Sequence, residues 1–208
     1  MNARVEHLVT SGVFSLDGQD FDVDNNVWLV GDDSEVLVVD AAHDAEAILA
    51  AVGGRRLAGI VCTHGHNDHV NAAAAVSDAT GAPIWLHPAD RMLWDVVNAG
   101  RTPGDLADGQ EITVAGTALT VLHTPGHSPG GVCLHAPDLR TVLTGDTLFR
   151  GGPGATGRSF SSFPTIIESI STRLLGLPGG TRVLTGHGDT TTIGDEAGEL
   201  QTWLARGH

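Results

Sequence analysis

The run Thr63-His64-Gly65-His66-Asn67-Asp68-His69 follows the apolar stretch Leu57–Cys62 directly and places four potential metal ligands within six residues. Imidazole nitrogen and carboxylate oxygen both suit zinc and related transition metals. Any one of these residues alone fits a polar surface loop or a hydrogen-bonded core histidine. The four together, in a loop after a buried-looking strand, favour a metal site, because loops held by rigid strands commonly carry function.

The spacing of the four ligands favours two ions over one. In an extended segment, His64 and His66 fall on the same side and the adjacent Asp68 and His69 diverge, because side chains alternate with period two. We therefore expect one ion at the His64/His66 pair and another at the Asp68/His69 pair. Further ligands must then come from elsewhere in the chain.

Three later segments offer such ligands at turn-like positions after apparent strands. They are Thr124–Gly131 with His127, Thr144–Phe149 with Asp146, and Thr185–Asp189 with His187. The expected extra histidines and aspartate are therefore present.

Composition limits the classes of function. The chain has 208 residues, and this length predicts a single domain over residues 1–208. The formal net charge of −14 opposes binding to nucleic acid and to anionic membranes. No apolar run reaches membrane-spanning length, and the first residues lack a secretory signal pattern, so we expect a cytoplasmic protein. The oligomeric state stays open.

Residue usage excludes some mechanisms. All 11 basic residues are arginine and the chain has no tyrosine, which excludes Schiff-base lysine and tyrosine general-acid chemistry. Cys62 and Cys133 lie in apolar runs and are expected to be buried structural residues. His43, His87, His123 and His135 are expected at the surface or in hydrogen bonds outside the site.

Hydrophobic patterning predicts an α+β chain in which strand-rich halves are interleaved with helices. The expected strands are 5–9, 26–30, 35–39, 57–62, 83–86, 111–114, 119–122, 131–135, 141–144 and 182–185, the first three as an antiparallel meander. The expected helices are 45–52, 70–79, 89–97, 165–175 with a capping box from Thr165 to Glu168, and 196–205. This pattern fits two packed sheets covered by helices.

The ordered His-x-His-x-Asp-His, Gly-His, Gly-Asp and Gly-His signatures resemble the metallo-β-lactamase superfamily across nearly the whole chain. The resemblance implies an αββα sandwich of two mixed β-sheets flanked by helices. It also implies one ion held by His64, His66 and His127, a second held by Asp68, His69 and His187, and Asp146 bridging the two. Asp40 matches the superfamily's early strand-end aspartate, which orients ligands.

Within the superfamily, the segments around His127, Asp146 and His187 and the Gly157-Arg158 turn resemble the short glyoxalase II-like (hydroxyacylglutathione hydrolase-like) metallo-hydrolases. True β-lactamases lack the bridging aspartate, and the lactonases of the superfamily use a tyrosine that is absent here. The glutathione-binding C-terminal helical region of full-length glyoxalase II is not expected. Arg150 and Arg158 lie in a Gly- and Ser-rich loop where a guanidinium could bind a substrate carboxylate.

The resemblance implies a dinuclear hydrolase of small-thiol thioesters that uses a metal-bridging hydroxide to attack the carbonyl. The expected cofactors are two divalent ions, zinc first and iron or manganese as alternatives. Asp68 and Asp146 are the expected catalytic residues, acting as ionised ligands rather than proton donors. Two alternatives stay open: a persulfide dioxygenase-like oxidoreductase with one iron at His64, His127 and Asp146, and a non-catalytic metal-binding module.

Overall fold

The computed structural model describes residues 3–207, so Met1, Asn2 and His208 of the predicted domain lie outside the described residues. The extent of that domain, 1–208, stays a prediction. The strands β1 to β14 are Arg4–Leu16, Gln19–Gly31, Glu35–Val39, Arg56–Val61, Ile84–Leu86, Gly104–Asp105, Glu111–Val114, Thr117–His123, Val132–Ala136, Thr141–Gly145, Leu148–Phe149, Gly152–Pro153, Arg182–Thr185 and Thr191–Thr192. The helices α1 to α7 are Ala45–Val52, Asn67–Val70, Ala73–Thr80, Arg91–Asn98, Phe163–Ser169, Ile193–Ala197 and Leu200–Arg206.

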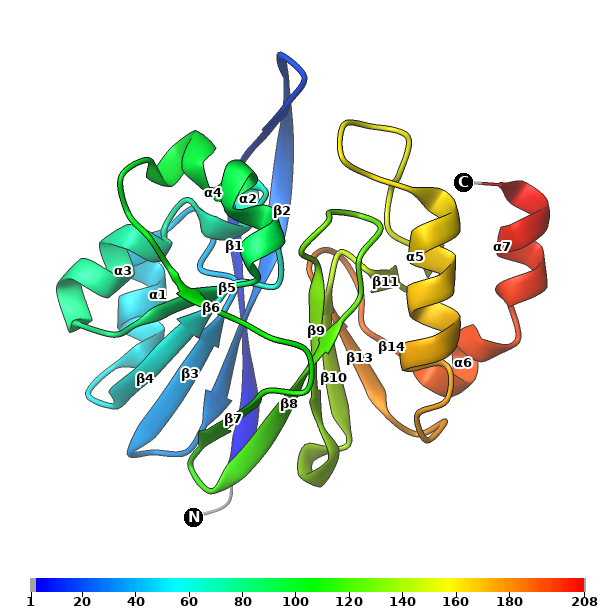
Figure 1. Ribbon diagram of the computed structural model, residues 1–208. Helices are drawn as coiled ribbons and strands as arrows, with labels where there is room; N and C mark the ends of the chain where they lie inside the picture. Colours follow the sequence, from blue (N-terminus) through cyan, green and yellow to red (C-terminus); the bar gives the residue numbers. More distant parts are fainter. Residues whose placement is uncertain (1–2, 208) are drawn as a thin grey trace.

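Two mixed six-stranded sheets form the centre of the molecule (Figure 1). The first has the order β1-β2-β3-β4-β5-β6, in which β1 to β3 are antiparallel and β3 to β6 are parallel. The second has the order β14-β13-β10-β9-β8-β7, with one parallel pair, β10 and β13. The antiparallel meander expected at the start of the chain is confirmed.

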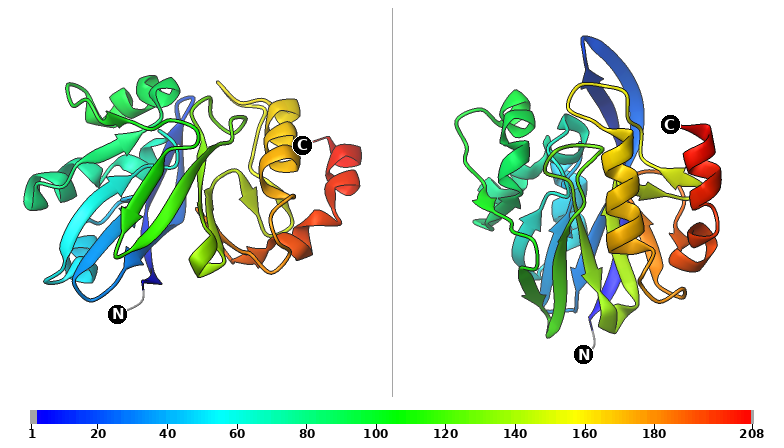
Figure 2. Two further views of the ribbon diagram at one scale, coloured as in Figure 1. Left: turned by 60° about the horizontal axis from the view of Figure 1, so that its bottom comes forward. Right: turned by 45° about the vertical axis from the view of Figure 1, so that its right-hand side comes forward.

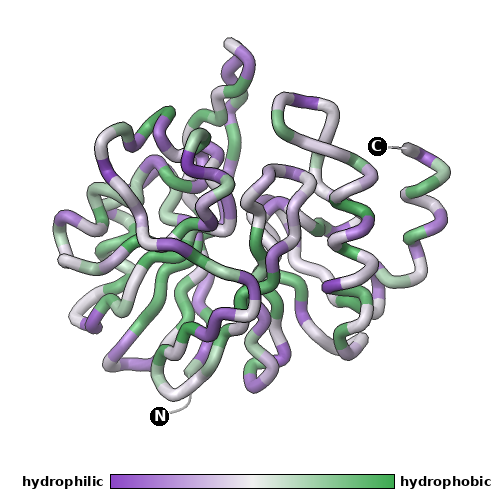
Figure 3. The backbone as a smooth tube through the Cα atoms, viewed as in Figure 1, coloured by the Kyte–Doolittle hydropathy of each residue, from purple (hydrophilic) through white to green (hydrophobic). Residues whose placement is uncertain are grey.

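The sheets pack face to face, and helices cover both outer faces (Figure 2). Side chains from both sheets, such as Leu37 and Leu134, form one buried cluster between them. A second cluster joins α1, α3 and α4 to the first sheet, and a third joins α5 and α7 to the second sheet. Figure 3 shows the apolar residues concentrated along these central strands. The predicted α+β, αββα sandwich is therefore confirmed.

The β1–β2 hairpin is much longer than the strands expected over 5–9 and 26–30. Its register is continuous from Arg4 opposite Gly31 to Leu16 opposite Gln19, so Asp17 and Gly18 form a two-residue turn. Both turn residues have positive φ, 53° and 74°, which suits the Asp-Gly hairpin turn. The outer half of β2 does carry a strand pattern, because Asp20, Asp22 and Asp24 alternate with Phe21 and Val23.

Three predicted helices differ from the structure. The expected helix over 70–79 is interrupted after Asn67–Val70 and resumes at Ala73. The expected helix over 196–205 is broken into α6 and α7. The capping box at Thr165 is wrong, because Ser162 caps α5 and accepts a hydrogen bond from the Thr165 backbone N–H. Helix α5 then continues as a π-helical turn, Ile170–Leu174, within the expected range.

Within residues 3–207, no helix combines the length and apolar character needed to cross a bilayer.

Candidate metal centre

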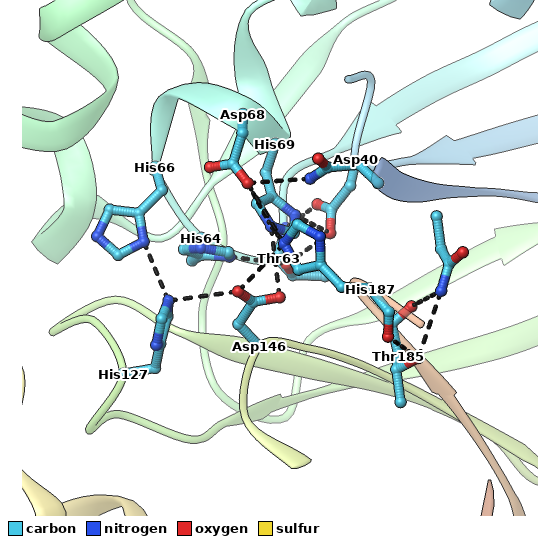
Figure 4. A network of polar contacts seen from close by, with 12 residues as sticks. Asp40, Thr63, His64, His66, Asp68, His69, His127, Asp146, Thr185 and His187 are labelled. Carbon is cyan, nitrogen blue, oxygen red and sulfur yellow. Dashed lines mark hydrogen bonds and ion pairs between the residues drawn. The ribbon is translucent and has the colours of Figure 1, made fainter. Parts of the chain in front are cut away.

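The predicted ligands all follow strands that end at the same edge of the two sheets (Figure 4). His64 and His66 lie between β4 and α2, and Asp68 and His69 lie in α2. The others follow strands of the second sheet: His127 follows β8, Asp146 follows β10 and His187 follows β13. Strands β8, β10 and β13 run in the same direction, so their carboxyl ends meet at one place.

His64, His66 and His127 form one group whose potential ligand atoms all lie within 4.8 Å of one another. The Nδ1 atom of His66 lies 3.0 Å from Nε2 of His127. This is the first of the two predicted ligand sets.

Asp68, His69 and His187 form a second such group. The Nε2 atoms of His69 and His187 are 3.1 Å apart, and Asp68 Oδ2 lies 3.5 Å and 3.3 Å from them, respectively. The expectation that Asp68 and His69 diverge is wrong. The segment is a helical turn closed by the His69 N–H to His66 carbonyl hydrogen bond, and a helix separates neighbours by only about 100°.

Asp146 lies between the two groups. Its Oδ1 is 3.3 Å from His69 Nε2, and its Oδ2 is 3.5 Å from Nε2 of both His127 and His187. A third group of potential ligands, His64, His69 and Asp146, therefore connects the two predicted sets. A carboxylate in this position could serve as a ligand to ions held by either group.

The polar atoms at this centre are arranged for metal coordination rather than for hydrogen bonds to one another. Nε2 of His64 and Oδ1 of Asp68 are buried and have no hydrogen-bond partner among residues 3–207, an arrangement that costs free energy unless a ligand satisfies them. In two places, a pair of imidazole nitrogens faces each other at about 3 Å. Nitrogen and carboxylate donors converging in this way match a site for zinc or another transition metal.

The outward ring nitrogens have acceptors that fix the imidazoles. Nδ1 of His69 donates to Asp40 Oδ2 at 3.0 Å, Nδ1 of His127 donates to the Ala155 carbonyl at 2.8 Å, and Nδ1 of His187 donates to the Asp24 carbonyl at 2.7 Å. Donation from Nδ1 turns Nε2 toward the centre, and this is the nitrogen that a neutral ring uses as a metal ligand.

Asp40 occupies the supporting position that the sequence predicted. It is buried and accepts 2.7 Å hydrogen bonds from the Thr63 backbone N–H and from the Thr63 hydroxyl. Its φ of 58° is left-handed, a conformation in which aspartate is among the less strained side chains. Asp40 therefore holds both the His69 ring and the start of the histidine loop.

Sequence reasoning missed several supporting residues. The Asn25 amide donates to Asp68 Oδ2 at 3.1 Å and lies 2.8 Å from Nε2 of the half-buried His43. The Asn26 amide and the Trp28 indole N–H donate to the Thr185 carbonyl beside His187. Only the long β2 strand brings Asn25 and Asn26 here, so no local pattern could identify them.

Protonation in the metal-free protein follows the burial of these groups. Burial and the neighbouring His69 hold the pKa of His64 well below its ordinary value. Burial and the neighbouring His127 lower the pKa of His66 to about 3. Burial alone disfavours charge on His187, but hydrogen bonds to Asp146 and Asp68 outweigh it and raise its pKa to about 10.

The two carboxylates remain ionised. Burial alone raises the pKa of Asp146, yet the charge on His69 and a hydrogen bond from His187 hold it well below the ordinary value. The pKa of Asp68 is also lowered, because His69 and His187 outweigh its burial. Protonated histidines thus balance the carboxylates in the metal-free centre.

His87, His123, His135 and the two cysteines lie outside the cluster. His87 and His123 stack on each other with ring centroids 4.1 Å apart, and His123 Nε2 lies 3.0 Å from the Pro129 carbonyl. His135 is partly buried on β9. Cys62 and Cys133 are buried free thiols, as expected.

The two loop arginines differ in their surroundings. Arg150 pairs with Asp189 at 3.1 Å on the surface. Arg158 lies over the ring of Phe21 at 5.0 Å and lines a hollow beside His66 and His127.

Comparison with known proteins identifies the family. Residues 21–187 match the model of the metallo-beta-lactamase superfamily. A hydroxyacylglutathione hydrolase, GloC of Haemophilus influenzae, is 30% identical over 188 residues, which cover 82% of this chain and 89% of GloC.

Two solved structures are similar in fold. A structure of TTHA1623 in a di-iron-bound form has a TM-score of 0.75 and 34% identity, and the alignment covers 84% of this chain and 93% of that one. The BLEG-1 B3 metallo-beta-lactamase has a TM-score of 0.76 and 29% identity over 90% and 96% of the two chains. With the matched fold and the matched residues together, the chain belongs to the metallo-β-lactamase superfamily.

Proposed function

We propose that this protein is a dinuclear metal-dependent hydrolase of small-thiol thioesters, of the glyoxalase II-like kind. The observation that carries the proposal is the position of Asp146, whose carboxylate lies within 3.5 Å of ring nitrogens from both groups of ligands. The similarity to a hydroxyacylglutathione hydrolase supports the choice of a thioester. The proposed ligands of one ion are His64, His66 and His127, and those of the other are Asp68, His69 and His187. Asp146 is a proposed ligand of both.

A pair of bound divalent cations supplies hydroxide at neutral pH and polarises a carbonyl oxygen. The chain's own residues orient the proposed ligands. Asp40 fixes the ring of His69, and the carbonyls of Ala155 and Asp24 fix His127 and His187. Asp68 and Asp146, whose pKa values are lowered, stay ionised and act as ligands rather than as acids.

The leaving group explains why a thioester suits this centre. Hydrolysis forms a bond from the water oxygen to the acyl carbon and breaks the carbon–sulfur bond. The products are a carboxylate and a thiol, and one proton is released to solvent. A thiol has a pKa of about 8.5, so it can leave as a thiolate with little protonation, whereas an amide nitrogen needs an acid placed beside it.

Metal analysis combined with a thioester panel tests this proposal. We expect about two zinc-like ions per chain, loss of hydrolysis on chelation, and recovery when divalent ion is returned. One iron per chain, with oxygen consumed in the presence of a persulfide, would instead establish the dioxygenase alternative. The di-iron-bound relative makes iron the first other metal to load and assay.

The Asp146→Ala variant separates a catalytic centre from a structural one. If the metals serve catalysis, the variant keeps its circular dichroism spectrum, binds less metal and loses turnover. If the metals only hold the fold together, the variant unfolds and the non-catalytic alternative gains support.

A further inference from the structure

His43 is not among the proposed ligands, yet a single residue connects it to one of them. Its Nε2 lies 2.8 Å from Oδ1 of Asn25, and the Asn25 amide donates to Oδ2 of Asp68 at 3.1 Å. Asn25 is buried, and His43 is half-buried in the loop between β3 and α1. A chain of two hydrogen bonds therefore runs from His43 to the metal centre.

The direction of these hydrogen bonds is fixed at the Asp68 end. An ionised carboxylate can only accept, so the amide nitrogen of Asn25 faces Asp68 and the amide oxygen faces His43. That oxygen also can only accept, so Nε2 of His43 must carry a proton. The His43 ring is therefore the donor that holds the Asn25 amide in this orientation.

Asn71 fixes the other nitrogen of the same ring. The backbone N–H of His43 can only donate, and it lies 2.6 Å from Oδ1 of Asn71, so the Asn71 amide nitrogen faces His43 Nδ1, at 3.0 Å. Nδ1 therefore accepts, and the ring is the neutral tautomer with its proton on Nε2. Burial also lowers the pKa of His43, which favours the same neutral ring.

The backbone of His43 adopts a conformation that serves this arrangement. Its φ is 59°, which is uncommon for residues other than glycine. The ring lies against β1, where a Cβ added at Gly12 would clash with it. Such conformations persist where the surrounding structure fixes the residue, and they concentrate at functional sites. Backbone, strand and Asn71 together keep the ring in one place.

The carboxylate of Asp68 depends on this support for its orientation. Its Oδ2 lies near the ring nitrogens of His69 and His187, which are proposed ligands themselves. Its Oδ1 is buried and has no hydrogen-bond partner in the part of the chain that the structure describes. Asn25 gives the carboxylate a hydrogen bond from outside the proposed ligands.

We infer that His43 is a positioning residue of the metal centre. Through Asn25 it orients the carboxylate of Asp68, and it thereby sets the affinity for the ion proposed at Asp68, His69 and His187. This inference rests on the dinuclear centre of the proposed function and does not depend on the substrate.

Two substitutions of His43 separate the roles of its two ring nitrogens. The side chain of asparagine ends near the place of Nδ1, so His43→Asn can keep the contact with Asn71 but loses the donor to Asn25. The side chain of glutamine reaches as far as Nε2, so His43→Gln can keep that donor. Asparagine also adopts positive φ more readily than glutamine does.

We expect the two variants to rank in opposite orders for metal affinity and for stability. His43→Asn lowers the affinity for one of two ions about tenfold, whereas His43→Gln stays within about twofold of the unmodified protein. In urea, His43→Gln unfolds more readily, because glutamine is strained at positive φ. Competition with a chromophoric chelator measures the affinity for each ion. A purely structural role predicts that affinity follows stability in both variants, and this result overturns the inference.

A double-mutant cycle tests the route through Asn25. Asn25→Ala lowers the same affinity, and adding His43→Asn to it causes no further loss, because the contact is already absent. Equal losses from His43→Asn with and without Asn25 overturn the inference. If Asn25→Ala does not fold, the comparison of His43→Asn with His43→Gln decides. His135→Asn, on β9 and outside the cluster, is the control and leaves both affinities unchanged.

The metal measurement separates failure of this inference from failure of the proposed function. Two bound ions with the expected ranking, and no thioester turned over, refute the thioesterase and retain the role of His43. Thioester turnover with equal metal affinities in the unmodified protein and His43→Asn refutes the role of His43 alone. One ion per chain, with an affinity that His43→Asn leaves unchanged, refutes both the dinuclear centre and the inference.

Discussion

The buried carboxylate of Asp90 accepts a 2.6 Å hydrogen bond from the hydroxyl of Ser128. It also accepts hydrogen bonds from the backbone N–H groups of Gly65, at 2.9 Å, and Gly130, at 2.5 Å. Gly65 lies between His64 and His66, and Ser128 follows His127. Asp90 therefore ties together the two loops that carry the first group of proposed ligands.

We expect Asp90→Ala to weaken metal binding at His64, His66 and His127 more than at Asp68, His69 and His187. The substitution leaves buried donors without an acceptor, which costs about 3 kcal/mol of unfolding free energy. Metal content per chain and urea denaturation measure the two effects. Ser128→Ala, which removes only one donor, serves as the milder control. A variant that retains two ions with unchanged affinities would contradict this role.

Replacing Asp40 with Asn removes the charge that faces His69 Nδ1 while retaining a side chain that tolerates positive φ. We expect metal affinity to fall about 10- to 100-fold with the fold intact, as for other residues that orient a metal-bound histidine. Competition with a chromophoric chelator measures the affinity. Asp44→Asn, a change at the cap of α1 away from the centre, is the control. Equal affinities in the two variants would refute the role of Asp40.

Metal uptake is expected to release protons at pH 7. The raised pKa values of His187, about 10, and of His69 mean that both are protonated in the metal-free protein, and a histidine must lose its ring proton to bind metal. Metal affinity therefore rises with pH as these groups deprotonate more readily. Calorimetry in buffers of different ionisation enthalpy counts the protons released.

Two variants make this measurement specific. His187→Ala should release about one proton fewer per chain. His66→Ala should leave the proton count unchanged, because the pKa of His66, about 3, means that it is already neutral. Metal binding without any dependence on buffer would show that the two histidines are not protonated beforehand.

The cap of α5 offers a test of the local structure. Ser162, rather than Thr165, accepts the capping hydrogen bond. We expect Ser162→Ala to lower the unfolding free energy by about 1 kcal/mol, with a smaller loss for Thr165→Ala. Thermal denaturation ranks the two variants, and the reverse order would restore the capping box that the sequence suggested.

The sequence by itself determined the residue types at the centre and the order of the fold. Potential metal ligands that are neighbours in the chain, such as His64 and His66, can be identified because their chemistry and spacing are local. Strands and helices with strong hydrophobic periodicity, such as Glu111–Val114 and Ala45–Val52, were predicted with the bounds that the structure has. The later proposed ligands, His127, Asp146 and His187, were found because each follows a strand.

Only the tertiary structure decided how these residues meet. The helical turn at Asn67 brings Asp68 and His69 to one place, which an extended segment could not do. The long pairing of β1 with β2 places Asn25 in contact with Asp68 and Phe14 in contact with His66. The fold also places Asp90 in contact with two separate loops, those of Gly65 and Ser128. These contacts join residues far apart in sequence, so they depend on strand register and packing, which no local pattern of side chains encodes.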